Sequence, residues 1–174
     1  FNNLLKGNVD YALDVHTQST GTVYPFFVFS DARDPAIHRM AELMPADQIK
    51  LDPGVNGTFP FSLIAIGVPA TTIEIGGPRV FDPEMVARAN EGFRNVMIDL
   101  KMIDGPMGRT AKTMKAFIGN DVKSVRALQG GYAEVLVKLG DMVKKDQKIA
   151  VQLNRFGDVV REYLAPVDGK VLSL

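Results

Sequence analysis

The sequence predicts an α/β fold with a mixed sheet, followed by a small all-β module. Strand-like and helix-like stretches alternate along residues 1–108, and a long amphipathic helix closes this part. After Gly108 the hydrophobic pattern changes to short strands separated by turn residues. Hydrophobic residues make up 46% of the chain, which is enough to bury a core. We therefore divide the chain into an α/β segment, 1–108, and a β module, 109–174.

The α/β segment contains three predicted strands. Residues 10–16 are a short apolar stretch that ends at His16, and residues 24–29 are rich in aromatic side chains. Residues 69–75 are mostly β-branched and stop at a Gly-Gly-Pro turn, as is typical of a buried strand.

Two helices are predicted at 35–44 and from 83 to about 103, each introduced by an Asp-Pro pair. The aspartate caps free amides of the first turn, and proline fits the first helical position. In the second helix, apolar residues recur at spacings of three and four, which gives it one face to bury. A short helix is also predicted at 61–66.

Composition and charge exclude several functional classes. Twenty basic residues balance twenty acidic ones, so no net field attracts nucleic acid or an anionic membrane. Cysteine is absent, which excludes disulfides, thiolate metal sites and a cysteine nucleophile within this sequence. No apolar run reaches the roughly 18 residues that a membrane-spanning helix needs. We expect a cytoplasmic protein that binds neither nucleic acid nor membrane.

The first residues have the pattern of a helix end. Gly7 follows the stretch 1–6 at the position where glycine commonly terminates a helix. From this pattern we expect further protein upstream of Phe1.

His16 is the first candidate site residue. It closes a predicted strand, and ligands of open α/β sheets bind beyond the carboxyl ends of the strands. A neutral imidazole is a good zinc ligand, and Asp14, on the same face of the strand, could orient its ring. The alternative is a histidine that only hydrogen-bonds a loop.

Glu74 is the second candidate. A carboxylate within Thr-Thr-Ile-Glu-Ile is costly to bury unless it is paired or functional. Thr72 shares its face, and the Gly76-Gly77 pair would allow backbone or substrate to come close. A partly desolvated glutamate suits a general base, a role that contributes about 10²–10⁴-fold to a rate. The alternative is an edge strand whose glutamate points to water.

Arg79 and His38 are weaker candidates. Arg79 follows the Gly-Gly-Pro turn, where its planar guanidinium could bind a substrate carboxylate or simply lie in solvent. His38 falls on the polar side of its predicted helix, and we expect it to face solvent without a function. No phosphate-binding glycine loop and no serine-hydrolase pattern accompanies them.

The order of these motifs resembles the succinylglutamate desuccinylase/aspartoacylase family, relatives of the zinc carboxypeptidases. The resemblance rests on Asp-Val-His-Thr at 14–17, on Thr-Thr-Ile-Glu-Ile-Gly-Gly at 71–77, on the long helix and on the β module. It implies the carboxy-terminal part of a zinc-carboxypeptidase-like mixed-sheet domain, followed by a barrel-sandwich-like β module.

The resemblance also implies an activity, the hydrolysis of an N-acylated amino acid or related amine by a zinc-bound water. His16 corresponds to the last of three zinc ligands and Glu74 to the general base, whereas Arg79 has no fixed family position. The His-x-x-Glu motif that supplies the other two ligands is absent from this sequence. The expected cofactor is therefore one zinc ion with its other ligands upstream, and this chain alone is expected to be inactive. A homo-oligomer is compatible with the resemblance.

Two other functions remain open. The protein could be a non-catalytic binding homologue that has lost its zinc site. Residues 130–174 also resemble the barrel-sandwich fold of biotinyl and lipoyl carriers, which present a modifiable lysine at a hairpin tip. The corresponding stretch here, 153–158, contains no lysine, which argues against a carrier.

Overall fold

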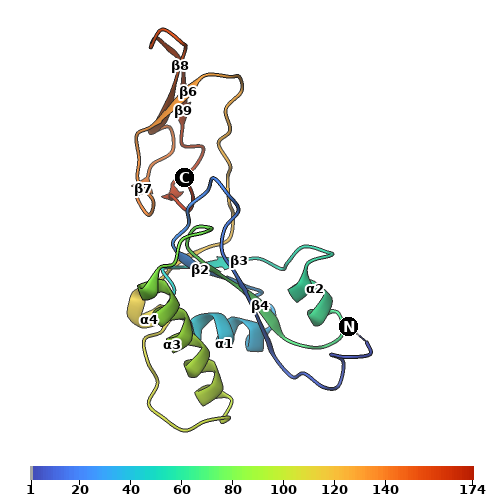
Figure 1. Cartoon of the computed structure of the whole chain (residues 1–174). Coiled ribbons are helices and arrows are strands. Elements are labelled where there is room, and N and C mark those ends of the chain that lie inside the picture. The colour runs from blue at the N-terminus through green and yellow to red at the C-terminus, as the bar shows by residue number, and fades with distance from the viewer. Residues whose placement is uncertain (1) are drawn as a thin grey trace. The chain divides into compact units, whose positions relative to one another are not determined.

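The computed structural model describes residues 2–174, and the chain forms two compact units that divide between Asp121 and Val122 (Figure 1). The predicted helix end at 1–7 includes Phe1, which lies outside the described residues. Residues 2–8 form turns, and Gly7 has a φ of 77°, the left-handed conformation that favours glycine.

A five-stranded mixed sheet, in the order β1-β4-β2-β3-β5, organises the first unit. The strands are β1 (Ala12–His16), β2 (Phe26–Ser30), β3 (Gln48–Leu51), β4 (Ala70–Ile75) and β5 (Phe117–Gly119). β1 and β4 are parallel, β2 is antiparallel to β4, and β3 and β5 follow parallel to β2. The three predicted strands are confirmed, but β3 and β5 were missed because four and three residues carry too short a pattern.

Helices cover the sheet on both faces. They are α1 (Pro35–Leu43), α2 (Phe59–Ile64), α3 (Pro83–Asp99) and α4 (Ala111–Met114). α1 and α3 lie along one face, where the main core contains Phe26, Val28, Ile37, Met40, Ile49, Ile73, Ala89 and Val96 (Figure 1). α2 packs on the other face through Leu63, against Ala70 of β4. The predicted Asp-Pro starts are confirmed, since Asp34 and Asp82 each accept two first-turn amides.

The third helix ends earlier than its apolar stripe predicts. Lys101 adopts a left-handed φ of 58°. Its amide donates to the Ile98 carbonyl at 3.0 Å, and the Met102 amide donates to the Met97 carbonyl at 2.8 Å. These two bonds form a Schellman motif in which lysine occupies the position that glycine usually takes. Because no glycine stands there, the sequence did not indicate where the helix ends.

The boundary of the first unit also differs from the predicted one at 108. α4 buries Ala111 in the main core, and β5 pairs with β3 in the first sheet. The Gly- and Pro-rich stretch 104–108 is therefore a connection within the first unit, and the predicted all-β pattern does not hold for the helix at 111–114.

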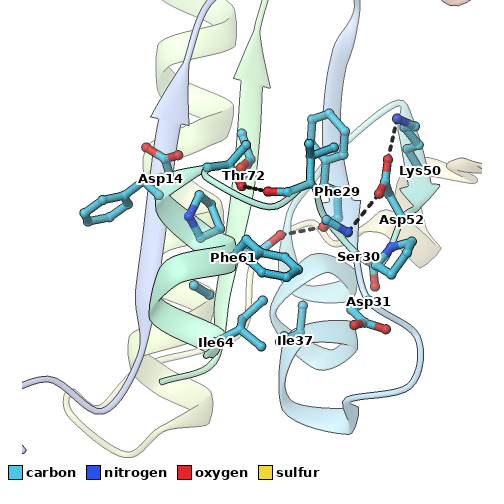
Figure 2. A pocket seen from close by; sticks show the side chains of 18 of the residues that line it. Asp14, Phe29, Ser30, Asp31, Ile37, Lys50, Asp52, Phe61, Ile64 and Thr72 are labelled. Atoms are coloured by element: carbon cyan, nitrogen blue, oxygen red, sulfur yellow. Dashed lines mark hydrogen bonds and ion pairs between the residues drawn. The ribbon is translucent and has the colours of Figure 1, made fainter. Parts of the chain in front are cut away.

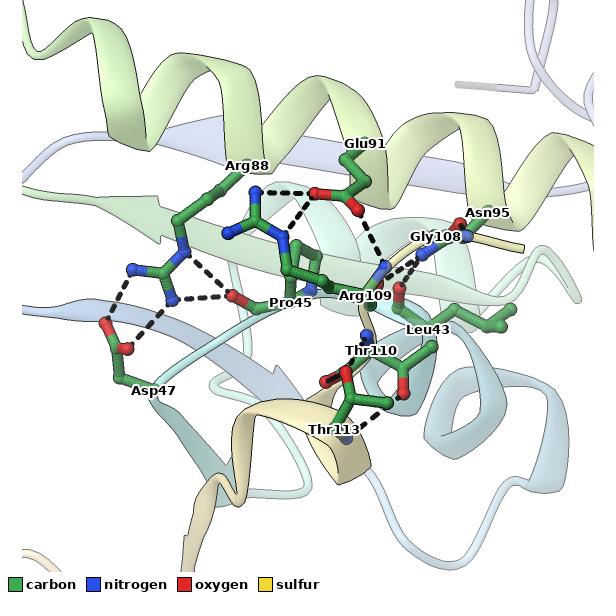
Figure 3. A network of polar contacts seen from close by, with 10 residues as sticks. All are labelled: Leu43, Pro45, Asp47, Arg88, Glu91, Asn95, Gly108, Arg109, Thr110 and Thr113. Carbon is green, nitrogen blue, oxygen red and sulfur yellow. Dashed lines mark hydrogen bonds and ion pairs between the residues drawn. The ribbon is translucent and has the colours of Figure 1, made fainter. Parts of the chain in front are cut away.

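The side chain of Asn95 on α3 is buried, and its hydrogen bonds hold the connection between α3 and α4 in place (Figure 3). Its side-chain amide donates to the Leu43 carbonyl at 2.9 Å and to the Arg109 carbonyl at 2.6 Å. Its side-chain oxygen accepts the Gly108 amide at 2.7 Å. One side chain thus satisfies three backbone groups and joins α1, α3 and the segment that leads to α4.

The second unit consists of strands and turns. An antiparallel sheet, in the order β6-β8-β9, and an antiparallel pair of short strands make it up. The strands are β6 (Tyr132–Val135), β7 (Met142–Val143), β8 (Lys148–Leu153), β9 (Val159–Leu164) and β10 (Gly169–Lys170). In residues 2–174, no helix combines the length and the apolar character needed to cross a membrane.

Candidate active site

A pocket of about 510 Å³ lies between the sheet and α2 (Figure 2). Asp14 and Thr72 face it from β1 and β4, and Phe61 and Ile64 face it from α2. Lys50 of β3 lies on the side away from Asp14. The pocket therefore extends across several strands of one sheet face.

His16 and Glu74 meet at one end of this pocket. The parallel register of β1 and β4 pairs these two residues directly, and both line the pocket. Alternation along the strands places Asp14 and Thr72, another register pair, on the same face. The structure thus brings the two sequence candidates, His16 and Glu74, together in one pocket.

Asp14 contacts the imidazole of His16. The Nε2 atom of His16 lies 2.9 Å from Oδ2 of Asp14. The His16 side chain is 50% exposed, whereas the Asp14 side chain is 19% exposed. The less exposed Asp14 carboxylate therefore holds the more exposed imidazole of His16 in one orientation. The contact leaves the other ring nitrogen to act as a ligand.

Glu74 is buried in an interior strand, so it does not point to water from an edge strand. The residue is 9% exposed, and its Oε2 atom is buried without a hydrogen-bond partner. Burial raises the pKa of Glu74, while His16 and a side-chain hydrogen bond from Gln18 lower it. The site therefore holds a desolvated carboxylate with one oxygen available for a new bond.

The glycines after β4 let other parts of the chain come close: the Gln18 amide donates to the Gly76 carbonyl at 3.2 Å. Gly76 has a φ of 70°, and a Cβ atom there would lie 2.9 Å from the Met85 sulfur of α3. Gly76 thus allows a tight turn against α3, and neither it nor Gly77 lines the pocket.

Arg79 and His38 lie apart from the paired site residues. Arg79 is exposed, has a φ of 60°, and is not among the residues that line the pocket. His38 is half-buried rather than solvent-facing: its Nδ1 lies 2.8 Å from the Ser30 hydroxyl and its Nε2 3.7 Å from Glu42. The end of β2 lies beside α1, and this contact draws the ring inward.

Lys50 and Asp52 line the pocket but were not candidates in the sequence. The Lys50 ammonium lies 2.6 Å from Oδ2 of Asp52 and 4.8 Å from the ring centre of Phe29. Lys50 is the sole lysine or arginine among the described residues that line this pocket. It was missed because β3 was not predicted, and a polar-apolar alternation over four residues is its only signal.

The pocket contains one side chain suited to bind zinc, that of His16. His16 supplies one imidazole with an orienting carboxylate, and zinc favours such a nitrogen ligand. Among residues 2–174, no group of three or more His, Cys, Asp or Glu side chains is placed to hold a metal ion. A catalytic zinc with three protein ligands would need further ligands from outside these residues.

Solved structures of known proteins share this fold. The apo ectoine utilization protein EutE (DoeB) from Ruegeria pomeroyi superposes with a TM-score of 0.82 at 22% identity, covering 94% of this chain and 54% of that one. A succinylglutamate desuccinylase/aspartoacylase from Rhodobacter sphaeroides gives 0.78 at 20% identity, covering 99% and 55%. An aspartoacylase family protein from Mesorhizobium loti gives 0.72 at 16% identity, covering 98% and 59%.

These similarities concern the three-dimensional structure. No protein-family model matches the sequence, and no curated protein matches it. The matches cover nearly all of this chain but only 54%, 55% and 59% of the three solved chains. The chain therefore has the fold of the succinylglutamate desuccinylase/aspartoacylase family, over a little more than half the length of these proteins.

Proposed function

We propose that this chain is the carboxy-terminal part of a zinc-dependent deacylase that hydrolyses N-acylated amino acids or related amines. The observation that carries the proposal is the direct pairing of His16 with Glu74 at one end of a pocket. The shared fold of desuccinylase/aspartoacylase proteins supports it. We further propose that the second unit corresponds to a barrel-sandwich-like module.

His16 would hold the zinc ion through the ring nitrogen that does not face Asp14. Bound zinc would lower the pKa of water and polarise the acyl carbonyl. Glu74 would take the proton of the attacking water at Oε2, the oxygen that lacks a partner. Its raised pKa suits a group that must accept this proton and then release it to the departing amine.

The proposed site is incomplete within this chain. One histidine does not hold a catalytic zinc, so two more ligands would come from a part of the protein outside these residues. We therefore expect the 174-residue chain to be inactive by itself.

The full-length protein that contains this chain is expected to release amine from N-acetyl or N-succinyl amino acids. Chelation of its zinc should abolish the release and added zinc should restore it, because the metal activates the water. Amine release is measured across a panel of such substrates, with the 174-residue chain assayed in parallel. A folded, zinc-loaded full-length protein that hydrolyses no member of the panel would favour a non-catalytic binding homologue instead.

A further inference from the structure

The loop at 52–58 joins β3 to α2 and forms part of the rim of the pocket (Figure 1). Its pocket-lining residues are Asp52, Pro53, Gly54, Val55 and Thr58. Residues 53–58 are exposed to solvent. A chemical change at the tip of this loop would therefore alter one wall of the pocket without entering the core.

Asn56 and Gly57 form the tip of the loop. The Thr58 amide donates to the Val55 carbonyl at 3.2 Å and closes a turn around these two residues. Gly57 has a φ of 90°, and a Cβ atom at this position would meet nothing within 4 Å. The backbone at Gly57 can therefore change its conformation without a clash, because neither a side chain nor a neighbouring segment blocks it.

An asparagine that is followed by glycine can react with its own backbone. The amide nitrogen of the following residue attacks Cγ of the asparagine side chain, and a cyclic succinimide forms as ammonia leaves. Any other residue in the following position hinders this attack, because its Cβ crowds the nitrogen. Asn56-Gly57 is the only Asn-Gly pair in the sequence.

The fold constrains several other asparagines but leaves Asn56 exposed. Asn95 is buried and makes three hydrogen bonds. The side-chain oxygen of Asn154 accepts the Asp158 amide at 3.0 Å. Asn90 lies within α3, where the helical hydrogen bonds hold the backbone amides in place. Asn56 lies outside the helices and strands, so the sequence pair and the structure favour the same position.

We propose that Asn56 is a site of spontaneous deamidation, which places an isoaspartate in the loop that lines the pocket. The Gly57 nitrogen gives its proton to a base in the solvent and forms a bond to Cγ of Asn56. The bond between Cγ and Nδ2 breaks, and the departing nitrogen takes a proton from water and leaves as ammonia. The reaction needs no part of the proposed deacylase site.

One water molecule then opens the succinimide ring at either of its two carbonyl carbons. Opening at Cγ leaves an aspartate with the original peptide bond. Opening at the backbone carbonyl carbon leaves an isoaspartate, in which the main chain runs through Cβ and Cγ. The second product lengthens the main chain by one atom and adds a carboxylate, so the turn from Val55 to Thr58 can no longer close as before.

Peptide mapping of the 174-residue chain, aged in a mildly alkaline buffer, tests this proposal. Trypsin releases the peptide 51–79, in which Asn56 is the only asparagine or glutamine. We expect this peptide to gain the mass that accompanies the exchange of an amide for an acid. The gain should be slower in a mildly acidic buffer, because the attacking nitrogen must lose its proton. A fresh sample digested in parallel corrects for deamidation during digestion.

Two other tryptic peptides serve as internal controls. The peptide 89–94 contains Asn90, and the peptide 149–155 contains Asn154. Both should keep their mass while the peptide 51–79 changes. Absence of a gain in 51–79, or an equal gain in all three peptides, would overturn the proposal.

Two glycine variants test whether the Gly57 nitrogen is the attacking group. Gly57→Ala should lose most of the gain, because the new Cβ crowds this nitrogen. Gly54→Ala is the matched control, since Gly54 lies in the same loop with a similar φ of 88°. It carries the same backbone strain and should deamidate at Asn56 as the wild type does. Deamidation of Gly57→Ala at the wild-type rate would contradict the proposed reaction.

A protease that cleaves before aspartate distinguishes the two products, because isoaspartate lacks the normal peptide bond. We expect most of the modified peptide to resist this protease at position 56. The amide resonances of Val55 and Thr58 should also shift further in the aged chain than in freshly prepared Asn56→Asp, which adds the charge without the extra backbone atom. Complete cleavage at position 56, or equal shifts, would contradict the proposed isoaspartate.

Discussion

Glu74→Gln in the full-length protein is expected to lower kcat/KM for the favoured N-acyl substrate by about 10²–10⁴-fold. The amide has nearly the shape of the carboxylate, so it preserves the packing of β4, but it cannot accept a proton from water. The Glu74 carboxylate lines the pocket and has one oxygen, Oε2, without a hydrogen-bond partner, and its basicity is what the substitution removes. Steady-state kinetics measures the loss, and zinc analysis of the same samples shows whether the metal is retained. Full activity of a zinc-loaded variant would refute the assignment of Glu74 as the base.

The same substitution should stabilise the isolated chain at neutral pH, by about 1 kcal/mol. Burial raises the pKa of Glu74 in the folded state above its value in the unfolded chain, so folding favours the protonated form. The stability that protonated Glu74 contributes is fully present below the unfolded pKa and is lost as the pH rises through the folded pKa. Urea unfolding should therefore show the advantage of Glu74→Gln at pH 7 and its decline as the pH falls through that folded pKa. Glu74 would thus be a functional residue whose buried charge lowers the stability of the folded chain.

Asn95→Ala is expected to reduce the free energy of unfolding by about 3–5 kcal/mol. The change removes three hydrogen bonds at once and leaves the buried Leu43 carbonyl, the Arg109 carbonyl and the Gly108 amide without this partner (Figure 3). Urea unfolding of the 174-residue chain measures the loss. The connection at 104–110 should also become more sensitive to protease, because Asn95 joins it to α1.

Asn90→Ala provides the matched control for this substitution. Asn90 lies on the same helix but is exposed, so its replacement should change stability by no more than about 0.5 kcal/mol. A loss in Asn95→Ala as small as that in Asn90→Ala would show that the buried network does not hold the connection in place.

The parts of the fold that the sequence predicted are those with a strong local signal. The Asp-Pro pairs marked the starts of α1 and α3, because capping depends on residues adjacent in sequence. β1 and β4 were recognised by their apolar runs and by the turns that end them. β3 and β5 are short strands whose stability comes from pairing with each other and with β2, which a local pattern does not contain. For the same reason the predicted boundary at 108 fell too early.

Among the residues of the candidate site, too, those with a strong local signal were predicted and the others were not. His16 and Glu74 were identified because a histidine at a strand end and a glutamate within a β-branched run are locally unusual. The 2.9 Å contact between Asp14 and His16 follows from strand alternation, so it could be anticipated. Lys50 could not, since it joins the pocket only when β3 is placed two strands away from β4. His38 was misjudged because its partner, Ser30, belongs to a different element.

The zinc content of the full-length protein and of its His16→Ala variant tests the central claim, that this chain supplies one ligand of a zinc site. The wild type should hold about one zinc ion per chain, and His16→Ala should lose most of it. His38→Ala serves as the control, because His38 contacts Ser30 rather than the pocket pair, and should keep its zinc. Zinc retention by His16→Ala at the wild-type level would contradict the account.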